Sequence, residues 1–491
     1  MSEVDKLTLE SKELEGGFRS TESLESQDHA KALDKIYRKL DLRIIPALWC
    51  LYFMTSLVGN SWGLTLTMNG DQGHSLVQTL NLTGKDISTA SALDYVGFII
   101  FDLPMNLIMT RVKPHTWLSR IVFSMGLVTF CYTFLKDRAG LIAIRFITGV
   151  AVSGFWPGMT LYLTYFYPVE RTTKRIGFYF TAAQIACAVA GLINAGFQKM
   201  DGARGYRGWQ WMYLICGTAT MFVAIISLWW LPDKPVPDSN DTRLNKLYNK
   251  FLKTSSPLTE EEQILHRKDL EERYRNTKWT LKDLVNVFCD LRIWPLILMY
   301  FGVVGTGYGL AVFATTIIKA NNPSLTSIDV SLLYAPIWLF DFAGILLITP
   351  FSDKYKRFRY LIFSGASLII IIGMIVATYA GSSWSRYGGL LIAGFGLGPT
   401  VPTCMAMAAE IFAPKHKEIG ISVACALVSG LGNLGSVVGT YALYSGWPAD
   451  VPRLYEYSNM MLVLMLGVSI VSAFVCQYTR DFEGFKRSTK S

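Results

Sequence analysis

Twelve apolar runs, each about as long as a membrane-spanning helix, dominate the 491-residue sequence. A helix needs about 20 mostly apolar residues to cross the hydrocarbon core of a bilayer, and each run approaches or exceeds that length. The bilayer offers the backbone no hydrogen-bond partners, so segments of this length fold as helices. The sequence therefore predicts an all-α membrane protein with twelve transmembrane helices. The predicted spans are 44–67, 87–110, 118–135, 141–166, 176–197, 209–231, 293–318, 329–350, 360–380, 387–412, 419–444 and 459–478.

The composition excludes the main soluble alternatives. Hydrophobic residues make up 51% of the chain and charged residues only 17%, whereas a soluble chain usually carries about a quarter charged residues. A large soluble enzyme is therefore not expected. The high apolar content also excludes a disordered or fibrous chain.

The predicted spans fall into two groups of six around one long polar stretch. This arrangement suggests two duplicated halves, as in many transporters. A local repeat supports it, because Phe166-Tyr-Pro168 and Phe412-Ala-Pro414 follow the fourth and the tenth span. Each is followed by basic residues and an Ile-Gly pair. The predicted organisation is an N-terminal tail at 1–43, a six-helix half at 44–231, a central loop at 232–292, a second six-helix half at 293–478 and a C-terminal tail at 479–491.

The positions of the basic residues predict the orientation. Of the 46 Lys and Arg residues, 36 lie in tails, loops or span ends on the side of the two termini, 9 lie on the other side, and Arg145 lies within a span. Cytoplasmic segments carry an excess of Lys and Arg, so both termini are predicted to be cytoplasmic. The same distribution accounts for the net charge of +9, and no nucleic-acid partner is expected.

Two polar segments carry helical patterns on the predicted cytoplasmic side. Residues 28–43 predict an amphipathic helix on the inner leaflet, preceded by an acidic, disordered stretch. In the central loop, Thr259 and Glu262 form the signature of a capping box, which predicts a charged helix to about Arg275. A second short helix is predicted over 280–291. The apolar face of the first helix contains Leu33, Ile36, Tyr37 and Leu40.

Neither the cysteines nor the histidines form a pattern of cofactor or metal ligands. The eight cysteines contain no pair at CxxC spacing, and they predict neither a zinc site nor a disulfide framework. All five histidines lie in tails or loops, which excludes a histidine proton relay within the membrane. We expect no metal and no cofactor.

Four ionisable residues lie within predicted spans. Asp94 and Asp102 are in the second span, Arg145 is in the fourth and Asp341 is in the eighth. Because such residues are costly in a bilayer, they mark functional sites by default. We predict that the three aspartates bind and release protons, since a carboxyl group at low dielectric holds its proton more strongly than one in water. Arg145 presents a planar donor fork that suits a carboxylate or a sulfonate, and we predict that it binds substrate.

Uncharged polar residues within spans are further candidates. Asn106 and Gln184 could line a substrate cavity, or they could form hydrogen bonds between helices. Asn81-Leu-Thr83 is a glycosylation sequon in the first predicted outer loop. Asn240-Asp-Thr242 also matches the sequon but lies in the predicted cytoplasmic loop. We expect Asn81 rather than Asn240 to be the acceptor.

The loop after the eighth span resembles a signature of the major facilitator superfamily. Its sequence, Ser352-Asp353-Lys-Tyr-Lys-Arg357, is similar to the family motif Gly-x-x-x-Asp-x-x-x-Arg, with Thr349 in the glycine position. The resemblance implies the major facilitator fold. It also implies that Asp353 and Arg357 act as a charged latch that gates the cytoplasmic side.

A closer resemblance covers most of the chain. It is to the fungal allantoate-permease group, also called the anion:cation symporter family, in which a glutamate is usual at the place of Asp102. That family commonly has an Asp-Arg pair late in the first span, where residues 57–63 here are uncharged. We therefore expect Asp94 to stand in for the missing acid. The resemblance rests on four stretches: Leu33 to Pro46, Tyr95 to Leu107, Arg145 to Arg171, and Gly208 to Trp211.

The resemblance implies proton-coupled import of a small anionic nutrient across the plasma membrane by alternating access. Candidate substrates are vitamin-type carboxylates such as nicotinate, pantothenate or biotin, allantoate, and sulfur compounds. Two alternatives stay open: a proton antiporter that exports drugs or metabolites, and a nutrient sensor that binds without transport. The endoplasmic reticulum and the vacuole are alternative membranes. We expect a monomer whose partners are its substrate, protons and lipid, and we expect no enzymatic activity.

Overall fold

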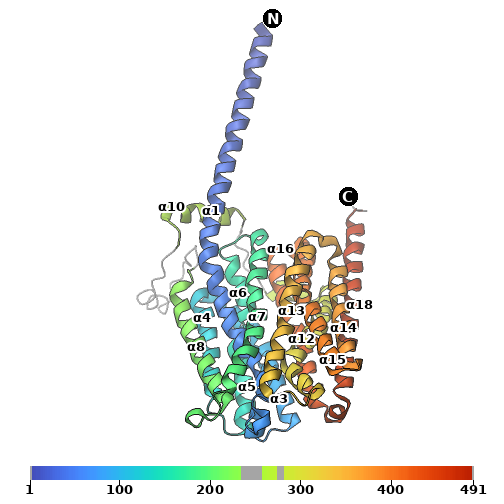
Figure 1. Cartoon of the computed structure of the whole chain (residues 1–491). Helices are drawn as coiled ribbons and strands as arrows, with labels where there is room; N and C mark the ends of the chain where they lie inside the picture. The colour runs from blue at the N-terminus through green and yellow to red at the C-terminus, as the bar shows by residue number, and fades with distance from the viewer. Residues whose placement is uncertain (1–2, 234–256, 274–280, 489–491) are drawn as a thin grey trace.

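The computed structural model of the chain describes residues 3–233, 257–273 and 281–488. These residues form helices joined by loops, and they contain no strand. The prediction of an all-α protein is therefore confirmed. Figure 1 shows the N-terminal part, coloured blue to green, beside the C-terminal part, coloured yellow to red.

The helices follow the predicted order of spans and loops. The N-terminal part contains α1 (Glu3–Thr67), α2 (Leu76–Thr79), α3 (Gly84–Arg111), α4 (Pro114–Tyr132), α5 (Arg138–Val152), α6 (Phe155–Thr164), α7 (Val169–Gln198) and α8 (Gly208–Trp230). The central segment contains α10 (Glu260–Arg273) and α11 (Leu281–Phe288). The C-terminal part contains α12 (Ile293–Asn321), α13 (Ser327–Lys354), α14 (Arg359–Tyr379), α15 (Ser383–Leu397), α16 (Thr400–Gly432), α17 (Leu434–Tyr441) and α18 (Glu456–Ser488). Short 3-10 turns lie at Gly70–Gln72, Ala203–Gly205, Lys356–Phe358, Tyr444–Gly446 and Pro448–Arg453.

Ten helical stretches in the described residues are long and apolar enough to cross a membrane. They match ten of the predicted spans. The second and third predicted spans are occupied by α3 and α4, which are not among the ten. The count of twelve spans stays a prediction.

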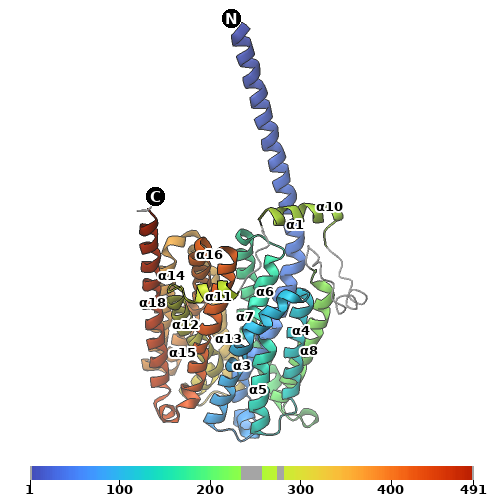
Figure 2. The ribbon, with the colours of Figure 1, turned by 180° about the vertical axis from the view of Figure 1, so that it is seen from behind.

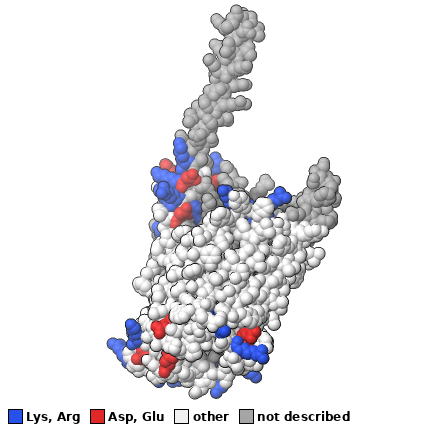
Figure 3. All heavy atoms as spheres, turned by 45° about the vertical axis from the view of Figure 1, so that its right-hand side comes forward, with Lys and Arg blue, Asp and Glu red and all other residues white. Residues whose placement is uncertain are grey.

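The surface shows the band expected of a membrane protein. In Figure 3, charged side chains gather at the two ends of the molecule, and the surface between them is almost entirely uncharged. A charged side chain is costly in hydrocarbon, so this distribution fits a bundle that spans a bilayer. We call the end that carries the outer ends of α1 and α18 the terminal face, and the other end the opposite face.

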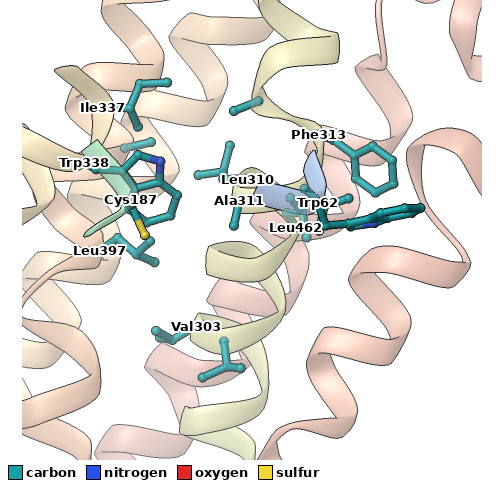
Figure 4. Close-up of a cluster of buried hydrophobic side chains, with 14 of the residues drawn as sticks. Trp62, Cys187, Val303, Leu310, Ala311, Phe313, Ile337, Trp338, Leu397 and Leu462 are labelled. Carbon is teal, nitrogen blue, oxygen red and sulfur yellow. The ribbon is translucent and has the colours of Figure 1, made fainter. Parts of the chain in front are cut away.

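The N-terminal and C-terminal parts pack against each other through several pairs of helices. These include α1 with α12, α3 with α16 and α17, and α7 with α13. Figure 2 shows the two parts side by side from behind. One continuous apolar cluster crosses the boundary, and Figure 4 shows Trp62 and Cys187 from the first part among residues such as Ala311, Trp338 and Leu397 from the second.

Two predicted spans are broken in the middle. The fourth span divides into α5 and α6 at residues 153 and 154, and the tenth divides into α15 and α16 at residues 398 and 399. Gly154 has a φ of +76°, a left-handed conformation that glycine adopts without strain. Pro157 and Pro399 lie at the start of the second helix in each case, where the missing proline N–H is tolerated. Hydropathy did not reveal these breaks, because the residues at both are apolar or small.

Two predicted boundaries also differ. The loop predicted between the tenth and eleventh spans is part of α16, which runs from Thr400 to Gly432. At the N-terminus, α1 is one helix of 65 residues from Glu3 to Thr67. The sequence predicted a disordered stretch followed by a separate helix on the leaflet.

The apolar face predicted at residues 28–43 is buried against protein. Leu33, Ile36, Tyr37 and Leu40 are all buried. Tyr37 contacts the rings of Tyr167 and His266, and its hydroxyl donates to Asp269 at 2.5 Å. Protein rather than the leaflet covers this face, because it packs in a cluster with α10 and with aromatic residues such as Tyr167.

Helix α10 is fixed to the terminal face by polar contacts as well. It starts at the predicted capping box, in which the Glu262 amide donates to the Thr259 hydroxyl at 3.4 Å. Lys39 of α1 forms an ion pair with Glu262 at 2.5 Å. His266 is buried, and its Nε2 lies 2.8 Å from the carbonyl oxygen of Phe166. Helix α10 therefore joins α1 to the segment between α6 and α7.

We predict that acid loosens α10. Burial lowers the pKa of His266 below its ordinary value, although the bond to Phe166 and the carboxylate of Asp269 act in the other direction. The undocked helix therefore binds a proton more readily than the docked one. Docking is at full strength above about pH 6.5, the usual histidine pKa, and weakens as the pH falls below it.

Hydrogen exchange of the α10 amides, measured by mass spectrometry at pH 7.5 and pH 5.5, tests this prediction. His266→Gln keeps an N–H donor but does not titrate. After correction for intrinsic rates, exchange in the native protein should increase at pH 5.5 relative to this variant. Equal acid responses in the two proteins would show that His266 does not control docking.

Candidate functional site

The most deeply buried charged contact among the candidate residues joins Arg145 of α5 to Asp94 of α3. The Nη2 atom of Arg145 lies 3.0 Å from Oδ2 of Asp94. The Arg145 side chain is 5% exposed and the Asp94 side chain is 19% exposed. Oδ1 of Asp94 is buried and has no hydrogen-bond partner. The carboxylate is therefore neutralised by one cation but incompletely hydrogen-bonded.

Close packing of α3 against α5 brings this pair together. Gly149 lies so near α3 that a Cβ atom there would fall 1.9 Å from the carbonyl oxygen of Asp94. Arg145 is one helical turn before Gly149, and its side chain reaches the same part of α3. Its Nε donates to the carbonyl of Ala90 at 3.4 Å, and its guanidinium lies over the Trp62 ring, 4.4 Å from the centroid. The sequence analysis did not single out Trp62, because an aromatic residue in a span gives no signal by itself.

The pair lies beside the boundary between the two parts of the chain. Tyr95, the neighbour of Asp94, contacts the ring of Tyr308 in α12 at a centroid distance of 4.9 Å. A guanidinium at such a position can exchange one carboxylate for another, because both present the same pair of acceptor oxygens. The arrangement therefore suits binding of a carboxylate in competition with Asp94.

Asp102 lies two helical turns further along α3 and has a different partner. It is 4% exposed, and its Oδ1 accepts the N–H of Gly154 at 2.9 Å. Gly154 is the N-cap of α6, so the carboxylate satisfies the start of the second helix in the broken fourth span. Asn106 donates to the backbone carbonyl of Asp102 at 2.9 Å, and its own side-chain oxygen has no partner.

Asp341 occupies the corresponding position in the C-terminal part. It is 1% exposed and lies against Gly398, at the break between α15 and α16. The side chain of Gln184, on α7 in the other part of the chain, lies next to its carboxyl group. The sequence contains a signal for this equivalence that the sequence analysis missed: Tyr95 to Asp102 and Tyr334 to Asp341 both read Tyr-x5-Phe-Asp.

The structure thus brings together two of the four predicted ionisable residues. Asp94 and Arg145 are in direct contact, Asp102 lies against α6, and Asp341 lies against α7 and Gly398. The sequence analysis assigned the three aspartates one common role and did not distinguish their surroundings. The helix breaks account for part of the difference, because Asp102 bonds to Gly154 at one break and Asp341 lies against Gly398 at the other. In the described part of the chain, no cluster of three or more His, Cys, Asp or Glu side chains could hold a metal ion.

A buried ion pair lies next to the residues of the predicted latch, whose role stays a prediction. The Asp353 side chain lies outside the described residues, and Arg357 is exposed. Two residues further on, buried Arg359 pairs with Glu410 of α16 at 3.0 Å and donates to the Ser352 carbonyl at 3.1 Å. This bridge joins the end of α13 and the start of α14 to α16 within the C-terminal part.

Polar contacts join the two parts of the chain at the opposite face. Asp71, after α1, pairs with Lys319 at 2.8 Å and accepts the N–H of Ser327 at 2.6 Å. Gln198, at the end of α7, donates to the Ser331 hydroxyl at 2.8 Å. Asn81 is exposed at the same face, three residues before α3 begins, while Asn240 lies outside the described residues. Opening this face requires these bridges to break.

Comparison with known proteins defines the class to which this architecture belongs. The model of the Major Facilitator Superfamily matches residues 44–440, and the chain belongs to that superfamily. It is a multi-pass membrane transporter rather than an enzyme.

Relatives and solved structures agree with this assignment. The chain is 45% identical over 466 residues to Vitamin H transporter 1 of Schizosaccharomyces pombe, covering 93% of this chain and 81% of the relative. It is 43% identical over 469 residues to an uncharacterized transporter of the same yeast, covering 93% and 74%. The fold resembles a bacterial homologue of the human lysosomal transporter Spinster, in an inward-facing, unoccupied conformation. The TM-score is 0.66 at 16% identity, over 89% of this chain and 96% of that one.

We predict strong coupling between Asp94 and Arg145 in stability. Removing one partner of a buried pair leaves an uncompensated charge and costs about 3–5 kcal/mol. Asp94→Asn and Arg145→Gln should each lower the thermal unfolding midpoint of the detergent-purified protein. The double variant should recover part of the loss, because no charge is left unpaired. Additive losses in the double-mutant cycle would mean that the two side chains do not interact.

Proposed function

We propose that the protein imports a small carboxylate together with protons, with Arg145 binding the substrate and Asp94 carrying a proton. The observation that supports this proposal is the buried ion pair between the two residues, beside the boundary between the two halves. A permanently paired arginine would only stabilise the bundle. The unpartnered oxygen of Asp94 and its partial exposure favour a pair that can open.

One protonation step would couple the two ligands. A proton that binds Asp94 removes its negative charge and weakens its hold on Arg145. The guanidinium then accepts the carboxylate of the substrate in a planar, bidentate contact. When the substrate leaves, Arg145 attracts Asp94 again and the proton is released. One proton and one anion thus cross together.

The contacts at the opposite face support alternating access. We propose that the terminal face is cytoplasmic and that the opposite face points outward, as the basic residues predict. The bridges from Asp71 and Gln198 to the C-terminal part then close the outer side. Outward opening would break them and expose Arg145 to the exterior. We propose the plasma membrane as the location.

Vitamin H, or biotin, is the first substrate to test. It is a small monocarboxylate, which is what a single buried guanidinium suits. A relative with 45% identity over almost the whole chain carries that name. Nicotinate, pantothenate, allantoate and sulfonates are the next candidates.

Uptake of labelled biotin tests the function. Cells that lack their own biotin uptake and express this protein should accumulate the label, faster at pH 5 than at pH 7.5. A protonophore should abolish the accumulation. Unlabelled nicotinate, pantothenate, allantoate and a sulfonate serve as competitors. If cells that express the protein contain less label and survive toxic compounds better than cells without it, the protein is an exporter and the proposed import is wrong.

The roles of Asp94 and Arg145 are tested by measuring biotin exchange and proton-driven biotin accumulation separately. Asp94→Asn resembles the protonated acid, so it should keep biotin counterflow but lower proton-driven accumulation at least tenfold. Arg145→Gln should lose both activities. Asp86→Asn is the matched control, because Asp86 lies on α3 near the opposite face, away from Arg145, where it accepts bonds from Thr83. It should transport like the native protein. Full accumulation by Asp94→Asn would remove this acid from the coupling step.

A further inference from the structure

The two equivalent acids at the helix breaks differ in one hydrogen bond. Asp102 accepts the N–H of Gly154, the N-cap of α6. The N-cap of α16 is Pro399, which has no N–H to donate. Oδ1 of Asp341 is accordingly buried without a partner. The C-terminal half therefore lacks the donor that satisfies the acid in the N-terminal half.

Nothing charged compensates for this missing donor among the described residues. Asp341 is in no ion pair there, and the titratable group that faces it is the thiol of Cys187 on α7. Gly398 closes the remaining side, since a Cβ atom there would lie 2.6 Å from Oδ1. Figure 4 shows Cys187 in an apolar cluster beside Trp338 and Leu397. An ionised carboxylate at this place would be buried and incompletely satisfied.

Gln184 completes the pattern from the other half. Its side chain lies next to the carboxyl group of Asp341, and its own Oε1 is also buried without a donor. Two buried oxygens, Oδ1 of Asp341 on α13 and Oε1 of Gln184 on α7, therefore have no hydrogen-bond donor. One proton on Asp341 satisfies both oxygens, because the protonated carboxyl group can donate to Oε1 of Gln184 while the Gln184 amide N–H donates to the carboxyl group.

We propose that Asp341 and Gln184 form a proton-binding site between the two halves, occupied in this conformation and emptied when α7 and α13 separate. The site deepens the proposed function, on which it rests, by adding a proton that depends on conformation rather than on substrate. While the proton is bound, the acid–amide pair holds the halves together. When the halves part, water reaches Asp341, and the proton leaves to solvent.

Modification of Cys187 measures this opening without any substrate. The thiol is buried, one turn from Gln184, so a reagent reaches it when α7 and α13 separate. The full-length protein in liposomes is treated with N-ethylmaleimide between pH 5.5 and pH 8, and Cys187 modification is quantified by mass spectrometry. Asp341→Asn keeps a neutral side chain at every pH. Comparing proteins at one pH removes the effect of thiol ionisation.

The ratio of native to Asp341→Asn modification should rise at least threefold from pH 5.5 to pH 8. Asp329→Asn, in the first turn of α13, should behave like the native protein. Pro399→Ala restores an N–H and should reduce the rise by at least half, so it tests the site even if Asp341→Asn does not fold.

Three results would overturn the proposal. One is a constant ratio across the pH range, and another is an unchanged response in Pro399→Ala. The third is protection of Cys187 by biotin in the native protein but not in Asp341→Asn, at every pH, which would make the pair a substrate site. If Cys187 modification shows the expected pH response but biotin is not taken up, the proposed function is contradicted and the proton-binding site is not.

Discussion

A carboxylate between membrane helices must be paired, hydrogen-bonded or neutral, and this requirement shapes the centre of the protein. Asp94 meets it with the guanidinium of Arg145, and Asp102 meets it with the backbone N–H of Gly154. Asp341 lies next to Gln184 but keeps one oxygen without a donor. The three acids look alike in the sequence, and their partners give them different chemistry.

Helix breaks place backbone groups next to two of the three acids, Asp102 and Asp341. In the fourth and tenth spans, the break exposes backbone groups in the middle of the bundle, where an acid from the second or eighth span lies against them. The N-cap residue is Gly154 in one break and Pro399 in the other, and only glycine has a backbone N–H that can bond to the acid. The two halves can therefore keep the same architecture while one acid accepts a backbone N–H and the other has an oxygen without a donor.

Much of this architecture could be predicted from hydropathy and charge, because burial in a bilayer leaves a strong signal over about 20 residues. The capping box at Thr259 was predicted equally well, since it depends on local chemistry. The partners of Asp102 and Asp341 could not be predicted, because they depend on helix breaks at small, apolar residues. The sequence also did not predict whether lipid or protein covers the apolar face that contains Tyr37, since an apolar face can pack against either. Local patterns identified the ionisable residues, but not which of them would touch.

The central segment also has a mechanical consequence. Helix α10 packs on α1 in one half, and α11 packs on α16 in the other. Helix α10 ends at Arg273 and α11 begins at Leu281, eight residues later in the sequence, so the Cα atoms of these two residues can be at most about 29 Å apart. This limit on the distance between α10 and α11 also limits how far the two halves can separate at the terminal face, unless one of the two helices undocks.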